Sequence, residues 1–284
     1  MTIVIAGCGW LGQALGAELL RGGHRVVGVR RDPAAARGLR QLGIEPLIAD
    51  LGSSDGVERL PAEVEAIVCC QSSAARTEAA YREAYLEVTG NLIEVARRRT
   101  IRHLVYTGST GVFGQTDGSQ VDELSPPLPQ SPTAEILVEA EQRLLRASRT
   151  GLPCTVVRLS GLYGPGRFGV IQRVRQGRLA LGAGEATWMN WCHLTDAVRT
   201  VAAVLARGRP GRVYHASDAH PARRADVVLW IAERLGIEPQ REPAAGAPTA
   251  ARTNRRVSAE RTRAELDLAL AYPSFREGLL AAFP

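Results

Sequence analysis

Short apolar runs rich in β-branched residues alternate with helical patterns through the first two-thirds of the chain, and this order constrains the fold most. The expected strands are Thr2–Ala6, Arg25–Val29, Glu45–Ala49, Ala66–Cys70, His103–Thr107, Cys154–Leu159 and Val213–Ala216. The expected helices are Leu11–Arg21, Pro33–Leu42, Glu78–Arg99, Ala134–Arg149 and Thr195–Arg207. Continuous apolar strands alternating with helices predict an α/β fold, a Rossmann-type doubly wound parallel sheet covered on both faces.

The pattern changes after Ser217. Two further helices, Asp226–Leu235 and Ser258–Leu268, flank Pro239–Ala251, a stretch rich in Ala, Pro and Gly. We therefore expect an NAD(P)-binding Rossmann domain over residues 1–160, with its sheet completed by about 194–217. Residues 161–284 are expected to form mainly a small C-terminal substrate-binding lobe.

The chain contains no lysine, because all 35 of its Lys+Arg residues are arginine. This excludes a Schiff base, a P-loop lysine and a lysine that helps a tyrosine to ionise. The net charge is +6, but arginine is spread along the chain in short runs that are typical of solvated helix faces. We expect no nucleic-acid partner.

The five cysteines form neither a CxxC pair nor a zinc-binding spacing, so no metal site is expected. An odd number without a disulfide framework is most simply explained by a reducing, cytoplasmic location. No apolar run reaches the length of a membrane span, so we expect no membrane association.

A glycine-rich GxGxxG stretch directly follows the first expected strand and opens the first expected helix. Gly7 would permit a tight turn, Gly9 would let a pyrophosphate approach the backbone, and Gly12 would let helix and strand pack closely. The helix N-terminus, with Trp10 and Leu11, would present N–H groups to the phosphates. The alternative is a glycine-rich turn that binds nothing.

The end of the second strand bears on the choice of cofactor. Arg30 and Arg31 suit the extra 2′-phosphate of NADP, so NADPH is favoured over NADH. Asp32 is the rival, because an acidic residue facing the ribose would favour NAD. Asp50 and Leu51, after the third strand, are placed to meet the adenine, although Asp50 is alternatively a helix N-cap.

Four further stretches contain recognisable motifs: Tyr106–Gly114, Val121–Glu123 with Pro129–Pro132, Arg158 with Gly161–Gly166, and Asn190–Asp196. They resemble motifs of the extended short-chain dehydrogenase/reductase family, which includes the sugar-nucleotide epimerases and dehydratases. The loop sequence GCGWLG departs from the family's usual GGxGFIG and looks more like a small atypical branch. We assign further cofactor contacts to Gln71, Ser72, Thr107, Ser160 and Gly161.

The resemblance implies chemistry based on a Tyr-x-x-x-Lys pair, in which the tyrosine moves a proton while nicotinamide moves a hydride. Here the family's register puts Thr133 at the tyrosine position and Leu137 at the lysine position. Glu141-Gln142 still follows, as it often does in the family, so a slipped register is not indicated. A well-placed acid/base contributes roughly 10²–10⁴-fold, and the usual epimerase or dehydratase mechanism is therefore not expected.

Three residues remain as catalytic candidates. Ser109 matches the family's active-site Ser/Thr, which donates a hydrogen bond to the substrate oxygen; alternatively it is a strand-end hydroxyl bonded to the backbone. Tyr163 is expected near the nicotinamide, or else as a packed side chain. His193 suits acid/base chemistry, or else has a structural role.

Loop carboxylates and two tryptophans are secondary candidates. Asp117, Asp122 and Glu123 would supply a carboxylate or cap their loop. Trp188 and Trp191 would stack on a flat or sugar-like substrate, or pack inside the lobe.

The leading hypothesis is an NADP-linked oxidoreductase that acts on a small molecule without the usual acid/base pair. The alternative is a dinucleotide-binding sensor or partner-binding module without turnover. The resemblance also implies a homodimer formed through Glu78–Arg99 and Ala134–Arg149.

Overall fold

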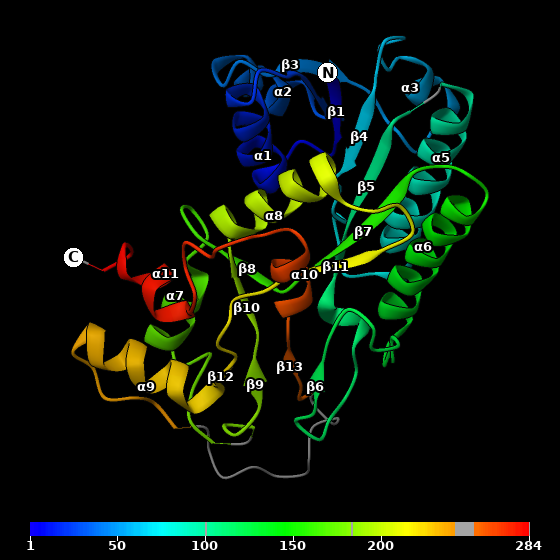
Figure 1. The fold of residues 1–284 in the computed structure, drawn as a ribbon. Coiled ribbons are helices and arrows are strands. Elements are labelled where there is room, and N and C mark those ends of the chain that lie inside the picture. Colours follow the sequence, from blue (N-terminus) through cyan, green and yellow to red (C-terminus); the bar gives the residue numbers. More distant parts are fainter. Residues whose placement is uncertain (100, 183, 242–252, 284) are drawn as a thin grey trace. The chain divides into compact units, whose positions relative to one another are not determined.

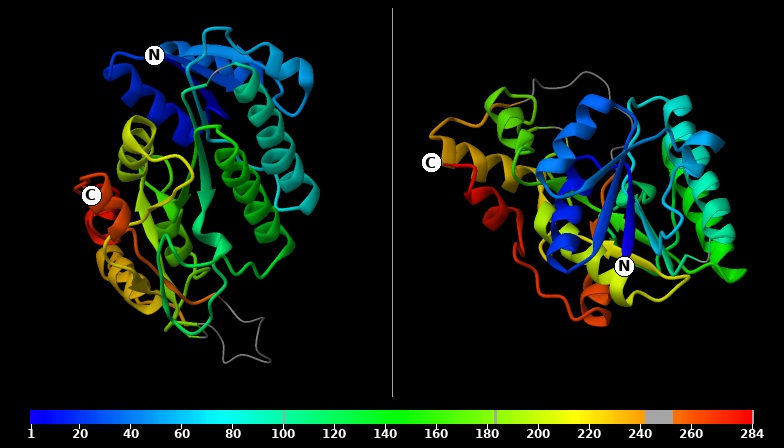
Figure 2. Two further views of the ribbon diagram at one scale, coloured as in Figure 1. Left: turned by 45° about the vertical axis from the view of Figure 1, so that its right-hand side comes forward. Right: turned by 90° about the horizontal axis from the view of Figure 1, so that it is seen from above.

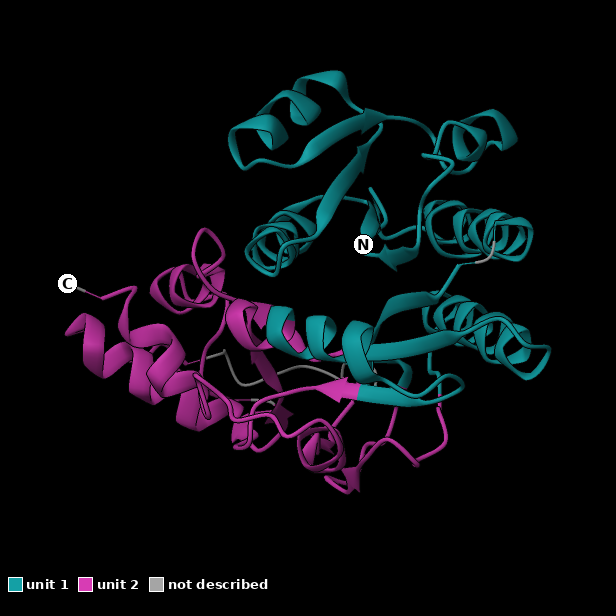
Figure 3. Ribbon diagram, turned by 45° about the horizontal axis from the view of Figure 1, so that its top comes forward, with its two compact units in different colours: residues 1–112, 129–158, 198–214 teal, residues 113–128, 159–197, 215–284 magenta. Residues whose placement is uncertain are grey.

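A computed structural model describes residues 1–99, 101–182, 184–241 and 253–283 (Figure 1). The chain divides into two compact units, drawn in two colours in Figure 3. The first unit contains residues 1–112, 129–158 and 198–214, and the second contains 113–128, 159–197 and 215–284. Most of the expected Ala-, Pro- and Gly-rich stretch Pro239–Ala251 lies outside the described residues.

Seven strands form the central sheet in the order β11-β7-β5-β4-β1-β2-β3. They are β1 (Thr2–Ala6), β2 (Arg25–Arg30), β3 (Glu45–Ile48), β4 (Ala66–Cys69), β5 (His103–Ser109), β7 (Cys154–Leu159) and β11 (Val213–Ala216). β1 pairs in parallel with both β2 and β4, and all five of its residues are buried. The predicted doubly wound parallel sheet is confirmed, because β1 lies centrally and the chain leaves it in both directions.

Helices accompany the sheet strands in alternation, as predicted. They are α1 (Trp10–Arg21), α2 (Pro33–Gln41), α3 (Ser54–Glu58), α4 (Glu78–Tyr81), α5 (Val88–Arg98), α6 (Pro132–Arg149) and α8 (Leu194–Arg207), with a short 3₁₀ turn η2 (Thr110–Val112). Side chains supply the N-caps of α2, α3, α4 and α6, where Asp32, Ser53, Thr77 and Ser131 accept a backbone N–H bond.

Alternate residues of the strands face opposite layers of helices. Val4 and Ala6 belong to the core formed with α5 and α6, which lie side by side in Figures 1 and 2. Ile5 faces α1 instead, and a Cβ added to Gly28 would meet Leu39 of α2. Because successive strand residues point to opposite faces, a continuous apolar strand must be covered on both sides, as the sequence predicted.

The predicted helix over Glu78–Arg99 is not one regular α-helix. A π-helical segment, η1 (Arg82–Glu87), separates α4 from α5. Tyr81 and Tyr85 are partly buried against the core, with ring centroids 5.2 Å apart. The hydrophobic periodicity of the segment does not distinguish i→i+4 from i→i+5 bonding, so the sequence did not reveal this change.

The second unit contains short strands and short helices. They are β6 (Gln120–Val121), β8 (Gly161–Tyr163), α7 (Gly169–Arg175), β9 (Trp188–Met189), β10 (Trp191–His193), β12 (Ala222–Arg223), α9 (Arg224–Leu235), β13 (Arg256–Val257), α10 (Glu260–Glu265) and α11 (Phe275–Leu280). Its core combines Tyr163, Trp191 and Phe275 with apolar residues of α7 and α9.

Residues 113–128 fall in the second unit, whereas the sequence had placed them in the Rossmann domain. The reason is a pairing that joins distant parts of the chain. β6 pairs in parallel with β13, and the carboxylate of Glu123 accepts bonds from the N–H and hydroxyl of Thr262. Such pairings across more than 130 residues are not visible in local sequence patterns.

Among the described residues, no helix combines the length and apolarity required to cross a bilayer.

A buried ion pair links α6 to β7 within the first unit. Arg158 donates to both carboxylate oxygens of Glu141, with the shortest distance 2.8 Å, and the two side chains are 4% and 2% exposed. Burial raises the pKa of Glu141 although Arg158 opposes the shift. Removing one partner therefore leaves an uncompensated charge in the core.

We predict that Glu141→Ala lowers the free energy of unfolding by about 3–5 kcal/mol, because it leaves Arg158 buried without its counter-ion. The measurement is urea unfolding followed by circular dichroism. The matched control is Glu139→Ala, which removes the half-exposed partner of Arg143 on the same helix and should cost only about 0–1 kcal/mol. Equal losses for the two variants would contradict the prediction.

Candidate functional site

The turn between β1 and α1 requires glycine at its first position. Gly7 adopts a positive φ of 81°. A Cβ at this position would lie 2.5 Å from the Cα of Gln71, two residues after the end of β4. The chain therefore turns tightly here and lies against the end of the neighbouring strand.

Gly9 and Gly12 leave the start of α1 accessible and close to the sheet. A Cβ at Gly12 would lie 2.9 Å from the Cγ2 of Ile5, so helix and strand pack in contact. Gly9 offers no side chain to cap α1, which leaves backbone N–H groups of the first turn directed outward. Leu11 is buried in the core and Trp10 is half-buried. This is the geometry that binds a phosphate at a helix N-terminus.

The three polar residues at the end of β2 have different partners. Arg30 donates to the carbonyl of Cys8 at 3.2 Å, and its Nη1 would lie 3.2 Å from a Cβ on Gly9, so its guanidinium is at the loop. Arg31 forms an exposed ion pair with Glu83. Asp32 caps α2 by accepting from the N–H of Ala34 at 2.8 Å.

After β3, the side chain of Asp50 accepts from the N–H of Gly52 at 3.0 Å. The alternative that Asp50 is the helix N-cap is wrong, because Ser53 caps α3. Leu51 is 5% exposed and belongs to the core, and its carbonyl accepts from Asn91 at 3.0 Å.

Gln71 stands beside Gly7 with an unsatisfied polar atom. Its Nε2 donates weakly to Thr89 at 3.4 Å, while its Oε1 is buried without a partner among the described residues. A buried acceptor without a donor is costly unless a ligand or water satisfies it. Ser72 is exposed next to it, and Thr107 is buried and donates to the carbonyl of Cys69 at 2.8 Å.

Ser109 ends β5 and is partly exposed. Its Oγ accepts from the N–H of Gly111 at 3.0 Å, which is the backbone bond that the sequence offered as the alternative. This bond uses a lone pair of the oxygen and leaves the hydroxyl proton available to another acceptor.

The first two turns of α6 contain the two residues at the expected dyad positions. Ser131 caps the helix and Pro132 occupies its first turn. The hydroxyl of Thr133 lies 3.1 Å from that of Ser131, and Leu137 is 8% exposed. Neither side chain titrates near neutral pH, so neither supplies an acid or a cation.

Tyr163 and His193 lie together in the second unit, with ring centroids 5.3 Å apart. Tyr163 is 2% exposed, its hydroxyl donates to the carbonyl of Ser274, and burial raises its pKa. His193 accepts from the N–H of Thr195 and packs on Tyr272, and burial lowers its pKa. Both environments favour the structural alternative over catalysis.

The other candidates of the second unit are largely structural. Ser160 donates to the hydroxyl of Ser217 at 2.9 Å, and Gly161 is exposed in β8. Trp191 packs on Tyr163 and Phe275. Asp117 and Asp122 accept N–H bonds of their own loop, as their capping alternative predicts, whereas Glu123 accepts from the N–H of Thr262 in α10 instead.

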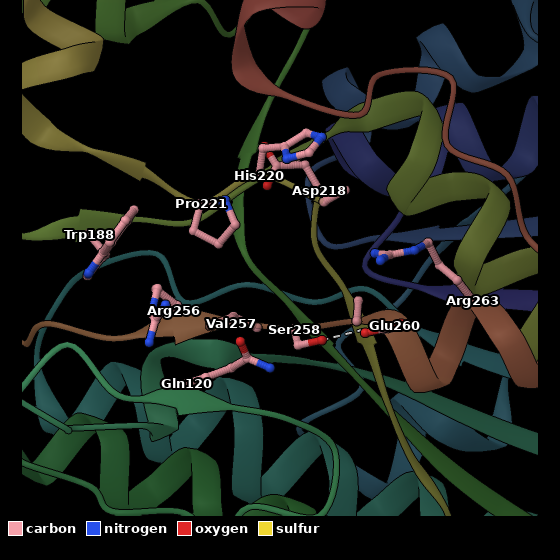
Figure 4. A pocket seen from close by; sticks show the side chains of 12 residues that line it. Gln120, Trp188, Asp218, His220, Pro221, Arg256, Val257, Ser258, Glu260 and Arg263 are labelled. Carbon is pink, nitrogen blue, oxygen red and sulfur yellow. Dashed lines mark hydrogen bonds between the residues drawn. The ribbon is translucent and has the colours of Figure 1, made fainter.

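Sequence reasoning missed a pocket within the second unit (Figure 4). Asp218 and His220 line one side of it, Arg263 reaches toward them from α10, and Trp188 lies at the opposite end. The available signal was a carboxylate two residues after β11, since ligands of α/β proteins gather at the carboxyl ends of strands.

The first unit thus has the architecture of the Rossmann-type dinucleotide-binding proteins, and a match to a protein family agrees with this class. The family described as "NAD dependent epimerase/dehydratase family" matches residues 3–217. The chain belongs to this family.

Three curated relatives cover most of the chain. Protein YeeZ of Escherichia coli K12 is 29% identical over 247 residues, covering 84% of this chain and 85% of that protein. A 4-hydroxy-2-methyl-3-oxo-4-farnesyl-3,4-dihydroquinoline-1-oxide ketoreductase of Stigmatella aurantiaca is 27% identical, covering 84% and 74%. A 2-alkyl-3-oxoalkanoate reductase of Stenotrophomonas maltophilia is 28% identical, covering 82% and 75%.

Solved structures share the fold. A functionally unknown conserved protein from Silicibacter pomeroyi matches with a TM-score of 0.75 and 29% identity, covering 99% of this chain and 97% of that chain. The dTDP-glucose 4,6-dehydratase DesIV of Streptomyces venezuelae, solved with NAD bound, matches with a TM-score of 0.84 and 22% identity, covering 99% and 95%.

We predict that Gly7→Ala lowers the free energy of unfolding by about 1–3 kcal/mol, because a Cβ strains the left-handed backbone and meets Gln71. Gly38→Ala in α2 is the matched control. Its Cβ would meet nothing within 4 Å, so it should stabilise the protein by about 0.5–1 kcal/mol. Thermal unfolding measures both, and a neutral Gly7→Ala would show that the turn tolerates a side chain.

Proposed function

We propose that this protein is an NADP-linked oxidoreductase that transfers hydride to or from a small molecule, without the family's tyrosine and lysine. The single observation that carries the NADP assignment is the position of Arg30, whose guanidinium lies against the glycine-rich loop. Arg31 is paired with Glu83 and Asp32 caps α2, which makes Arg30 the residue best placed to bind a 2′-phosphate.

The residues of the first unit fit a dinucleotide. Gly7, Gly9 and Gly12 would let its pyrophosphate approach the start of α1, and Gln71 has a buried oxygen in need of a donor. NADPH, when bound, supplies a hydride at its nicotinamide ring. The names of the two reductase relatives, which refer to oxo compounds, support a carbonyl-containing substrate.

Ser109 is the proposed donor to the reacting oxygen. Its Oγ already accepts the Gly111 N–H, and its hydroxyl proton stays available for a substrate oxygen. In the reductive direction Ser109 would stabilise negative charge on the substrate oxygen, and water would supply the proton. An electrophilic substrate such as a conjugated carbonyl or an iminium needs little further acid assistance.

Thr133 and Leu137 also favour a second candidate, a dinucleotide-binding sensor or partner-binding module without turnover. The experiment that separates the two begins with NADPH and NADH binding, measured by fluorescence. A panel of carbonyl and imine compounds then tests for NADPH consumption. Binding with turnover supports the oxidoreductase, binding without turnover supports the sensor, and absence of binding below about millimolar concentration rejects both.

A homodimer through the region of α4, α5 and α6 and a cytoplasmic location stay predictions. Analytical ultracentrifugation tests the first, and fractionation of cells tests the second.

We predict that Arg30→Ala raises the Kd for NADPH about 10- to 100-fold, because a charge-assisted bond to the 2′-phosphate contributes about 1.5–3 kcal/mol. The Kd for NADH should change less than about twofold, since NADH lacks this phosphate. Arg21→Ala, which removes an exposed ion pair with Glu18 at the far end of α1, is the control. Equal weakening of NADPH and NADH would argue against a 2′-phosphate contact.

We predict that Ser109→Ala lowers kcat at least about tenfold on any substrate found, because a hydroxyl donor to the reacting oxygen is lost. Ser109→Thr keeps the hydroxyl and should retain most of the activity. The Kd for NADPH should be unchanged in both variants. An alanine variant with wild-type kcat would remove Ser109 from the mechanism.

A further inference from the structure

The pocket of the second unit contains unsatisfied polar groups of opposite charge. Its volume is about 330 Å³, and all its lining residues belong to this unit. This volume falls at the lower end of the range for small-molecule sites. None of the contacts proposed for NADPH or for Ser109 uses these residues, so the pocket requires its own explanation.

Asp218 is the most unusual group in the pocket. It follows β11 directly after Ser217 and is only 2% exposed. The N–H of His220 lies near it, yet neither carboxylate oxygen makes a hydrogen bond of normal geometry to any described residue. An unsatisfied buried carboxylate is costly, and native structures keep one where a ligand, an ion or water completes it.

Arg263 is the complementary group. It projects from α10 toward Asp218 across the pocket (Figure 4). Its Nη1 is buried and also lacks a hydrogen-bond partner among the described residues. The pocket therefore has an unused acceptor and an unused cationic donor that do not bond to each other.

We propose that this pocket binds a small zwitterionic amino acid or amino acid derivative, with its carboxylate on Arg263 and its ammonium group on Asp218. A guanidinium binds a carboxylate through parallel N–H bonds, and a buried carboxylate is best satisfied by a cation. One ligand thus completes both groups. The proposal concerns the second unit alone and does not depend on the proposed redox function.

The remaining walls leave room for a side chain. Gln120 and Ser258 present polar groups from β6 and from the residue after β13. Arg223 and Arg256 both lie over the ring of Trp188, at 4.6 and 5.5 Å from its centroid, and so hold the indole in place. A ligand side chain that extends toward this end would contact the edge of the indole, where a flat or polar group fits.

Charged groups from several elements face Asp218. Arg263 of α10 favours its ionised form, while Glu277 of α11 and Asp196 of α8 oppose it. The phenol of Tyr163 and the thiol of Cys192 also interact with it. Burial has the largest effect, and together these influences raise the pKa of Asp218 to about 8. The free pocket therefore contains a mostly protonated carboxyl at neutral pH.

This protonation state predicts how the affinity of the ligand changes with pH. An ammonium group requires ionised Asp218, so binding below pH 8 must release one proton. The affinity should then rise about tenfold per pH unit between pH 6 and 7, because one proton is linked to binding. A hydroxy acid carries no cation and should show no such slope.

The test is isothermal titration calorimetry with a panel of L-amino acids that includes L-phenylalanine and L-glutamine. Titrations in two buffers of different ionisation enthalpy count the protons released. L-Phenyllactate lacks the ammonium group and phenethylamine lacks the carboxylate, so both should bind at least about tenfold more weakly than L-phenylalanine. The pH series is repeated with His220→Gln, since an imidazole can also change charge near neutral pH.

Asp218→Asn should abolish the pH slope and Arg263→Gln should weaken binding at least about tenfold while keeping the slope. Asp226→Asn on the exposed start of α9 is the matched control and should behave as the wild type. The proposal is overturned if no amino acid binds below about 10 mM, if L-phenyllactate binds as well as L-phenylalanine, or if Asp218→Asn keeps the proton release. These results are independent of NADPH binding, so they do not bear on the redox assignment.

Discussion

The close contact between α1 and the sheet is the constraint on which the first unit depends. Gly12 brings the helix within contact of Ile5, and Gly16 brings it against Ile44. Any side chain at these positions would push α1 away from β1. The same contact fixes the start of the helix beside the end of the strand, so the requirement for packing also creates the tight turn at Gly7, next to which we propose that the pyrophosphate binds.

The polar residues near that turn show that neighbouring side chains, even of the same type, can have different partners. Arg30 and Arg31 are adjacent in the chain, but Arg30 is the last residue of β2 and Arg31 lies in the bend after it. Arg30 reaches the loop, whereas Arg31 pairs with Glu83 at the surface. The sequence identified the pair correctly as the place of interest, but it had no means of ranking the two arginines or of showing that Asp32 is committed to capping α2.

The catalytic candidates also differ in how much of their role the sequence could identify. The glycine-rich turn, the strand ends and the position of Ser109 followed from periodicity and family resemblance. Tyr163 and His193 lie in family-matching stretches that form the ends of β8 and β10, but their rings pack against each other, and His193 also packs on Tyr272. A buried phenol and a buried imidazole are stabilised in their neutral forms, which is a property of the surroundings and not of the residue type. Asp218 is the opposite case: burial has the largest effect and raises the pKa of a carboxyl that the sequence did not single out.

The sequence by itself determined the doubly wound sheet, the glycine-rich turn between β1 and α1, and the absence of any lysine chemistry. These features rest on local patterns: strand and helix periodicity, glycines at set spacing and composition. Only the tertiary structure decided that residues 113–128 join the second unit through β6 and β13, and that Asp218 and Arg263 face one pocket. Both depend on contacts between segments far apart in the chain, and burial and missing hydrogen-bond partners exist only once those segments have met.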